Sequence, residues 1–248
     1  MPPAARPAAT LILLRETAPA APPDLLMVER SARMRFAAGA AVFPGGAVDA
    51  ADHALAAQHA PADPDDLAAR IAAIRETLEE TGLAIGLTGP TAPEHHAAAR
   101  ADLATDPSLA ALLAKRGWHL APDLLIPYAR WRPPFANGFD TRFYLARLPA
   151  HAPAPTPDHT ENARAWWSPA AATLAAADTR LLFPTQCTLA RLAPHASFAE
   201  AAADAARHPP TAALTPQIER FADADWLTVP PGHGYPPLRQ PLATARRH

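Results

Sequence analysis

The feature that most constrains the fold of this sequence is one amphipathic helix, predicted over residues 64–81. Asp63 suits the N-cap, Pro64 suits the first helical position, and Gly82 suits the end of the helix. Four apolar residues recur at intervals of four, three and four positions: Leu67, Ile71, Ile74 and Leu78. Because this spacing places them in a single stripe, the helix must pack one face on a hydrophobic core.

Elsewhere the chain alternates between short apolar segments and helical segments. We expect strands over residues 11–14, 25–28, 40–43, 83–87, 124–130, 141–148 and 163–167. We expect further helices over residues 91–115, with a break near Asp106-Pro107, and over residues 170–177, 184–192 and 197–207. Ser168 and Pro169 provide an N-cap and a first helical residue for the helix at 170. This alternation indicates the α/β class.

The domain organisation follows from the absence of a linker between two self-sufficient halves. We expect one domain over residues 1–248, with a core over about residues 11–180 and a helical extension over about residues 181–228. The proline-rich tail over residues 229–248 is expected to wrap the surface or to be loose.

Composition limits the partners of the protein. The chain has 248 residues and a formal charge of -2, which argues against a nucleic-acid coat or a polybasic membrane anchor. The apolar run 11–14 is too short for a signal peptide or a membrane span. Cys187 is the one cysteine, so no intrachain disulfide forms and we expect it to be an inert helix residue. A cytoplasmic protein that binds neither nucleic acid nor membranes is therefore expected.

Three carboxylates lie near the end of the predicted helix, on the side away from the apolar stripe: Glu76, Glu79 and Glu80. Like charges three or four positions apart on an exposed helix face repel one another. A divalent cation that prefers oxygen ligands, such as Mg²⁺ or Mn²⁺, would remove this repulsion. The alternative is a solvated acidic face that binds nothing.

The segment 75–83, taken with Gly45-Gly46, resembles the signature of the Nudix hydrolases. That signature opens with a glycine and a glutamate and closes with Arg-Glu-apolar-x-Glu-Glu-x-Gly-apolar. Seven of its nine defined positions are filled, by Gly46, Arg75, Glu76, Glu79, Glu80, Gly82 and Leu83. The resemblance implies an α/β Nudix fold, in which a mixed β-sheet lies between helices and extra C-terminal helices are added.

Two departures from the signature concern the loop before the helix. Gly46 and Arg75 are 29 positions apart, so the sequence carries an insertion between them. The first glutamate has no clear counterpart, because Asp52 has the matching offset from Gly46 while three other aspartates directly precede the helix: Asp63, Asp65 and Asp66. Thr77 also stands where the signature has an apolar residue.

A longer resemblance points to one branch, the nudix motif 19-like hydrolases, whose mammalian members are coenzyme A diphosphatases. It extends through residues 139–144 and 165–169 and covers about residues 11–221. The segment 26–46 also partly matches a coenzyme A-type pattern, although Ala37 stands where that pattern has a histidine.

The implied activity is Mg²⁺-dependent hydrolysis of a nucleoside diphosphate linked to a second group, with coenzyme A or an acyl-coenzyme A favoured. Within the same class, ADP-ribose, NADH and dinucleoside polyphosphates compete as substrates. A different class of function is a catalytically silent Nudix module that binds a nucleotide or a protein. A homodimer is a further expectation.

The resemblance also implies roles for the helix residues. Glu79 and Glu80 would bind the metal, and Glu76 would be a third ligand or would accept the proton of the attacking water. Arg75 would orient a carboxylate, and Gly46 would let the loop backbone approach the metal site closely.

Weaker candidates each have an ordinary alternative. Glu161 would supply a distal metal ligand or be an exposed glutamate. Arg30 and Arg35 would hold substrate phosphates or be surface charges. Asp140 and Arg142 would contact substrate or form a local ion pair. Four aromatic residues would stack a base or pack in the core: Trp131, Phe135, Trp166 and Trp167.

Overall fold

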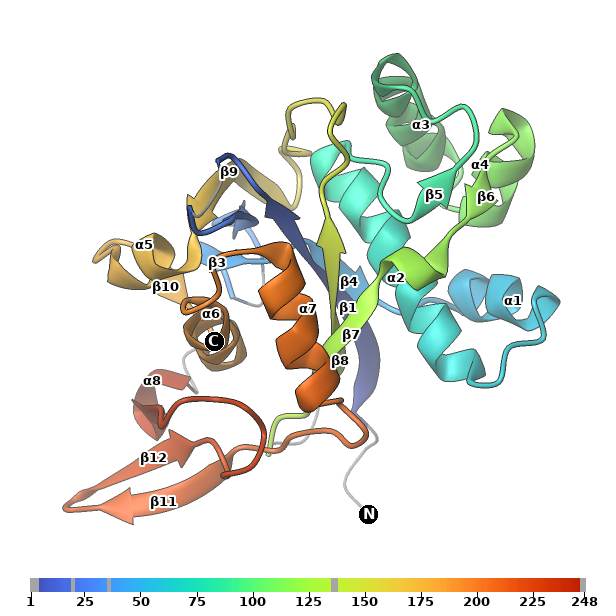
Figure 1. The fold of residues 1–248 in the computed structure, drawn as a ribbon. Helices are drawn as coiled ribbons and strands as arrows, with labels where there is room; N and C mark the ends of the chain where they lie inside the picture. Colours follow the sequence, from blue (N-terminus) through green and yellow to red (C-terminus); the bar gives the residue numbers. More distant parts are fainter. Residues whose placement is uncertain (1–4, 19–20, 35–36, 135–137, 246–248) are drawn as a thin grey trace.

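A computed structural model of the protein describes residues 5–18, 21–34, 37–134 and 138–245. Within these ranges the centre is one mixed sheet (Figure 1). Its main path runs in the order β10 (Arg180–Leu181), β3 (Ala40–Val42), β2 (Asp24–Arg30), β1 (Arg6–Arg15), β8 (Phe139–Arg147) and β7 (Ile126–Trp131). Two more strands join beside this path, β4 (Gly45–Ala47) on β1 and β9 (Asn162–Pro169) on β2. β1 runs parallel to β8 and antiparallel to β2 and β4.

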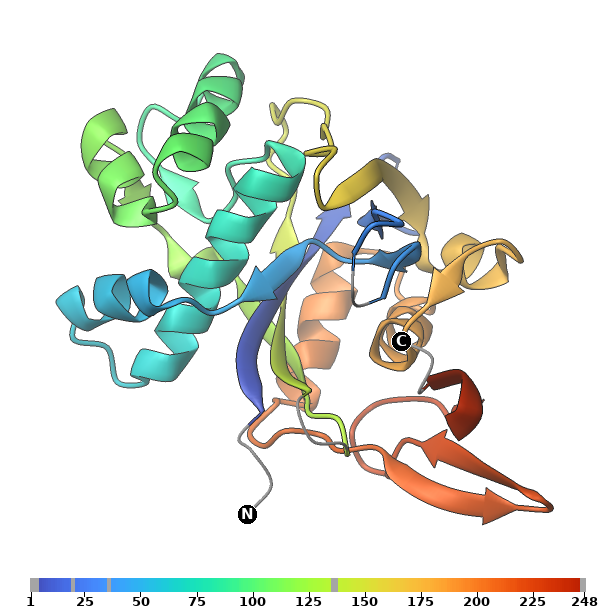
Figure 2. The same cartoon turned by 180° about the vertical axis from the view of Figure 1, so that it is seen from behind.

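The central strand β1 is buried on both faces. Its side chains alternate, so that Leu11 and Leu13 enter one hydrophobic core while Ile12 and Leu14 enter another. The first core is covered by α1 (Ala50–Gln58), α2 (Pro64–Thr81), α3 (Pro93–Thr105) and α4 (Leu109–Arg116). The second is covered by α5 (Ala170–Ala175), α6 (Phe183–Leu192) and α7 (Phe198–Arg207). The two sides of this layered arrangement are seen in Figures 1 and 2, and it confirms the expected α/β architecture.

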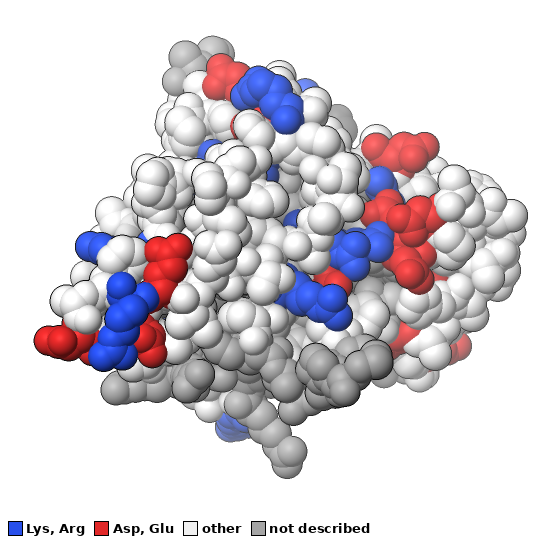
Figure 3. Space-filling model, turned by 90° about the horizontal axis from the view of Figure 1, so that it is seen from below, with Lys and Arg blue, Asp and Glu red and all other residues white. Residues whose placement is uncertain are grey.

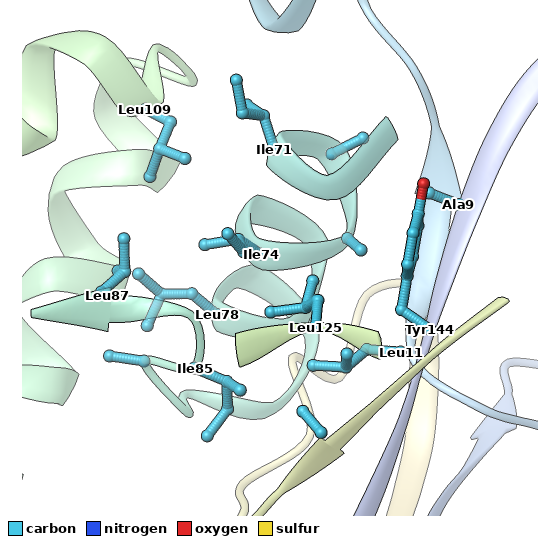
Figure 4. Packing of buried hydrophobic residues seen from close by; sticks show 14 of the residues in the cluster. Ala9, Leu11, Ile71, Ile74, Leu78, Ile85, Leu87, Leu109, Leu125 and Tyr144 are labelled. Carbon is cyan, nitrogen blue, oxygen red and sulfur yellow. The ribbon is translucent and has the colours of Figure 1, made fainter. Parts of the chain in front are cut away.

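Helix α2 begins and ends where the sequence predicts. The Asp63 side chain accepts a hydrogen bond from the Asp66 backbone at 2.9 Å, and Gly82 ends the helix in the left-handed conformation at φ 71°. Ile71, Ile74 and Leu78 are fully buried in the first core. Figure 4 shows them among other side chains of this core. This face is fixed on the sheet, so the glutamates of the last turns are also fixed in direction.

The insertion between Gly46 and α2 contains a helix that the sequence analysis did not predict. This is α1, which packs Leu55 and Ala56 into the first core. It is alanine-rich, so its buried face carries little hydrophobic contrast with the rest of the helix.

Two local predictions are wrong. Residues 83–86 are not a strand, because the left-handed conformation of Gly86, at φ 72°, interrupts an extended backbone. Leu83 is still buried in the core. Only the short strand β5 (Leu87–Thr88) follows, and it pairs with β6 (His119–Leu120). Ser168 is not an N-cap. It lies inside β9, and Pro169 occupies the N-cap position of α5.

The C-terminal segment, whose last part we expected to wrap the surface or to be loose, contains regular secondary structure. It forms a small sheet of β11 (Gln217–Phe221), β12 (Ala224–Thr228) and β13 (Arg239–Pro241), followed by α8 (Leu242–Ala245). Tyr235 lies in the segment that connects β12 to β13, and its hydroxyl accepts a hydrogen bond from the Trp131 indole at 2.9 Å. A short 3₁₀ helix, η1 (Pro122–Leu124), precedes β7. In the parts of the chain that the structure describes, no helix is both long enough and apolar enough to cross a membrane.

Candidate active site

The site forms where the last turns of α2 meet the double glycine of β4. The Gly45 backbone donates a hydrogen bond to Oε2 of Glu80 at 2.9 Å. A Cβ on Gly46 would lie 2.4 Å from the carboxyl carbon of Glu76, and one on Gly45 would lie 2.2 Å from the Ala9 carbonyl oxygen. Only glycine therefore lets this backbone approach the sheet and the helix so closely.

The glutamates are less exposed than the sequence suggested. Glu80 is only 4% exposed, and the Glu76 and Glu79 side chains are 16% and 27% exposed. The expectation of an exposed acidic face is wrong, because β4 and β9 cover the end of α2 from which these side chains project.

Arg75 connects two of the glutamates to the inserted helix. Its Nη1 donates to Oε1 of Glu76 at 2.9 Å and to Oε2 of Glu79 at 3.0 Å. On its other edge, Nε and Nη2 donate to the two oxygens of Asp52 at 3.1 and 3.0 Å. Among the aspartates considered for the first position of the signature, Asp52 is the one that contacts Arg75. Burial opposes the charge on Arg75, but these carboxylates raise its pKa above the usual value.

Burial also controls the protonation of the glutamates. It raises the pKa of Glu80 to about 8, although the hydrogen bond from Asn162 opposes this shift. It raises the pKa of Glu76 to about 7 against the opposing charge of Arg75, and the pKa of Glu79 is raised for the same reason. A bound cation would favour the charged forms, so cation binding here would be coupled to the release of protons.

Asn162 is a site residue that the sequence analysis missed. Its Nδ2 donates to Oε1 of Glu80 at 2.8 Å from the first position of β9. No local pattern marks it, because the two residues are 82 positions apart. The neighbouring Glu161 is exposed, and its charge helps to raise the pKa of Glu76. The structure therefore brings this distal acid to the helix glutamates.

Two basic candidates, Arg30 and Arg35, come from the segment that precedes Gly46. Arg30 pairs with Asn162 across strands β2 and β9, and its charge lowers the pKa of Glu80 against the larger effect of burial. Arg35 lies outside the described residues, as does Phe135.

Asp140 and Arg142 do not join the glutamates. Arg142 binds Asp66 at 3.0 Å in the first turn of α2, roughly 15 Å along the helix from Glu76. Asp140 instead accepts two hydrogen bonds from Arg130, at 2.8 and 2.9 Å. The alternative of a local ion pair between Asp140 and Arg142 is therefore wrong, because each has a partner on another strand or on α2.

These charges border a cleft of about 280 Å³ that Arg130, Arg142 and Asp66 line together with Tyr144. On the face of the molecule in Figure 3, acidic and basic atoms lie close together, and neither sign covers a large continuous area.

The other aromatic candidates pack against protein groups. Trp131 is 2% exposed and makes edge contacts with Phe183 and Tyr235. Trp166 and Trp167 lie under the guanidinium groups of Arg164 and Arg15. Cys187 is fully buried, which raises the pKa of its thiol.

The residues present fit a hard divalent cation. Their donors are carboxylate oxygens, and the approach of Gly46 to Glu76 leaves no room for a Cβ between loop and helix. Across the described ranges, no three His, Cys, Asp or Glu side chains form a ready-made metal cage. Mg²⁺ needs none, because it typically binds one or two carboxylates and keeps waters or phosphate oxygens as its other ligands. Glu76, Glu79 and Glu80 could hold it, with Glu161 nearby.

Comparisons with known proteins agree with this geometry. A family model described as the NUDIX domain matches residues 4–185. The acyl-coenzyme A diphosphatase NUDT19 of Gallus gallus is 28% identical over 214 residues, covering 62% of this chain and 56% of that protein. The chain therefore spans little more than half the length of this relative. The crystal structure of a Nudix hydrolase from Alicyclobacillus acidocaldarius has a TM-score of 0.69 and 31% identity, covering 81% of this chain and 96% of that one.

Proposed function

This chain belongs to the NUDIX domain family, and we propose that it is a Nudix diphosphatase whose substrate is coenzyme A or an acyl-coenzyme A. The observation that carries the proposal is the placement of Glu80 against Gly45 and of Glu76 against Gly46, with Glu79 held beside them by Arg75. The similarity to an acyl-coenzyme A diphosphatase and the pairing of Arg30 with Asn162, which binds Glu80, support this substrate class.

We assign the metal site to Glu76, Glu79 and Glu80, with Glu161 as a distal contributor. When bound there, Mg²⁺ would neutralise charge on the phosphates and lower the pKa of a bound water. The chain holds Glu80 between the Gly45 backbone and the Asn162 amide, and it holds Glu79 through Arg75. These contacts fix the carboxylate directions before substrate arrives.

Glu76 would be the third metal ligand or the group that accepts the proton of the attacking water. Its Oε1 binds Arg75, so Oε2 is the oxygen that would take the proton. Burial raises the pKa of Glu76 in the metal-free protein, and a bound cation would oppose this shift. Arg30, together with Arg35, would bind substrate phosphates. Asp140 and Arg142 would contact only a remote part of the substrate, because they lie beside the first turn of α2.

A substrate panel tests the proposal. Purified protein with Mg²⁺ is incubated with coenzyme A, an acyl-coenzyme A, ADP-ribose, NADH and a dinucleoside polyphosphate, and the products are identified by mass spectrometry. We expect coenzyme A to yield adenosine 3′,5′-bisphosphate and 4′-phosphopantetheine. Preferred turnover of another compound would overturn the substrate assignment.

The matched control is the pair of substitutions Glu79→Gln and Glu80→Gln, which keep side-chain size and remove both charges. Unchanged turnover in this variant, or no turnover of any compound by the unaltered protein, would overturn the proposed activity. Tight, Mg²⁺-independent binding of an intact nucleotide in calorimetry would instead identify a silent binding module. A homodimer and a cytoplasmic location are further parts of the proposal, tested by light scattering and by cell fractionation.

A further inference from the structure

Glu80 is held at both oxygens by segments that are distant in the sequence. Gly45 of β4 donates to Oε2, and Asn162 of β9 donates to Oε1. Asn162 is completely buried. A charged carboxylate can only accept hydrogen bonds, so the amide nitrogen of Asn162 must face Glu80 whenever Glu80 is ionised, as it would be with a cation bound. The orientation of the whole side-chain amide is thereby fixed.

The other end of this amide has no protein partner. Oδ1 of Asn162 is a buried acceptor that receives no hydrogen bond among the described residues. Leaving such a buried acceptor unsatisfied is unfavourable, because it has lost its hydrogen bonds to water. Oδ1 is bonded to the same carbon atom as the nitrogen that binds Glu80, so this unpaired acceptor belongs to the group that contacts the carboxylate. A donor that arrives at Glu80 would satisfy it, and water held by a cation is such a donor.

The loop that carries Asn162 is fixed from two directions. The Asp158 carboxylate accepts hydrogen bonds from the backbones of Glu161 and Asn162 at 3.0 and 2.7 Å. The Thr156 backbone donates to the Thr81 carbonyl at the end of α2 at 2.8 Å. The position of the Asn162 amide relative to Glu80 is therefore built into the fold.

We propose that Asn162 is a positioning residue, which orients Glu80 through Nδ2 and accepts a hydrogen bond from metal-bound water through Oδ1. This inference rests on the proposed Mg²⁺-dependent function. Groups that contact metal ligands in this way commonly change metal affinity by about 10–100-fold when they are removed.

Metal affinity without substrate is the first test. Binding of Mn²⁺ is measured by electron paramagnetic resonance in the unaltered protein and in Asn162→Leu, which keeps similar volume and removes both polar atoms. We expect Mn²⁺ to bind about 10–100-fold more weakly to the variant. The matched control is Thr173→Val. Thr173 of α5 is also buried, but its hydroxyl donates to the Pro169 carbonyl, at the opposite end of β9 from Asn162. This variant should leave Mn²⁺ affinity unchanged.

A double-mutant cycle separates positioning from a general structural effect. If Asn162 acts through Glu80, Asn162→Leu should change Mn²⁺ affinity by less than about threefold in a Glu80→Gln background. Unchanged affinity in a folded Asn162→Leu variant would overturn the proposal. So would the same loss in both backgrounds.

A measurement on the unaltered sequence keeps the proposal testable if Asn162→Leu does not fold. The chain has only two asparagines, Asn137 and Asn162, so asparagine-selective ¹⁵N labelling gives two side-chain amide signals. Asn137→Ser identifies them. We expect the Asn162 signal to exchange slowly with solvent and to shift when Mg²⁺ is added.

An Asn162 amide signal that does not shift when Mg²⁺ is added would contradict the proposal. Turnover of coenzyme A by the unaltered protein is scored separately, so this inference can fail while the proposed function stands.

Discussion

Arg75 and Asp52 form a two-point ion pair, with nitrogen–oxygen distances of 3.1 and 3.0 Å, and both side chains are almost completely buried. Asp52 lies on α1, the helix of the inserted segment, so the insertion supplies the partner of the motif arginine. The opposite edge of Arg75 binds Glu76 and Glu79. The inserted helix therefore helps to set the direction of two active-site carboxylates.

Removal of Asp52 should both destabilise the protein and reduce its activity. Asp52→Ala leaves a buried guanidinium with one side uncompensated, which typically costs about 3–5 kcal/mol; Glu76 and Glu79 remain, so the lower end is expected. Urea unfolding measures the loss, and turnover under folded conditions should fall at least about tenfold, because Arg75 no longer holds two carboxylates in place.

Arg75→Lys is the companion variant. Lysine keeps the charge but cannot bind both oxygens of Asp52 in the same plane. We expect a smaller loss of stability than in Asp52→Ala, with a comparable loss of turnover. Unchanged turnover in both variants would show that the Arg75 contacts do not position the site.

Gly46→Ala should reduce activity with little loss of stability. A Cβ there would displace the Glu76 carboxylate, but Gly46 does not have the positive φ that makes alanine strained. Gly117→Ala is the opposite control, because its φ is 63° and nothing lies within 4 Å of the added carbon. It should cost about 1 kcal/mol of stability and leave turnover unchanged. Equal turnover in the two variants would contradict the close packing of Gly46 on Glu76.

The metal-free protein should lose stability as the pH rises. Burial raises the pKa of Glu76 to about 7 and that of Glu80 to about 8, from an ordinary value of 4.5. The native state therefore keeps protons that the unfolded chain has released. Its stability advantage is fully present below about pH 4.5 and is lost as the pH rises through the two raised values.

Mg²⁺ binds the charged carboxylates, so it should raise the Tm more at about pH 8.5 than at about pH 5.5. Thermal unfolding with EDTA or with saturating Mg²⁺ measures the difference. The paired substitutions Glu76→Gln and Glu80→Gln should abolish it. A Tm gain that is the same at both pH values in the unaltered protein would speak against these shifts.

We propose that residues 1–248 fold as one unit that includes the C-terminal segment, and Tyr235 tests this. Its ring packs on Trp131 with centroids 5.2 Å apart, and its hydroxyl accepts the indole hydrogen bond. Tyr235→Ala should cost about 3 kcal/mol in urea unfolding, and Tyr235→Phe about 1 kcal/mol. Full stability of Tyr235→Ala would mean that this segment does not support the fold.

Helix α2 was predictable because its signals are local. Asp63 and Gly82 lie next to its ends, and its apolar stripe repeats within 18 residues. The offset of Asp52 from Gly46 was also a local signal, although its pairing with Arg75 depends on how α1 folds. The distal Glu161 came only from the family resemblance.

The burial of Glu80 could not be predicted in the same way. It depends on Gly45 and Asn162, which lie 35 and 82 positions away. The partner of Arg142 is Asp66, 76 positions away, so proximity along the chain wrongly suggested Asp140. The strands of the C-terminal sheet were missed because β11 is exposed along its whole length and carries no alternation of buried and exposed side chains.

The central claim is that the glutamates of α2 bind a divalent cation beside the double glycine. A crystal soaked in Mn²⁺, with anomalous diffraction recorded at the manganese edge, locates the ion directly. We predict a peak at bonding distance, about 2 Å, from carboxylate oxygens of Glu80 and of Glu76 or Glu79. Mn²⁺ bound at full occupancy at other sites in the crystal, with no anomalous peak near Gly45 and Gly46, would contradict the account.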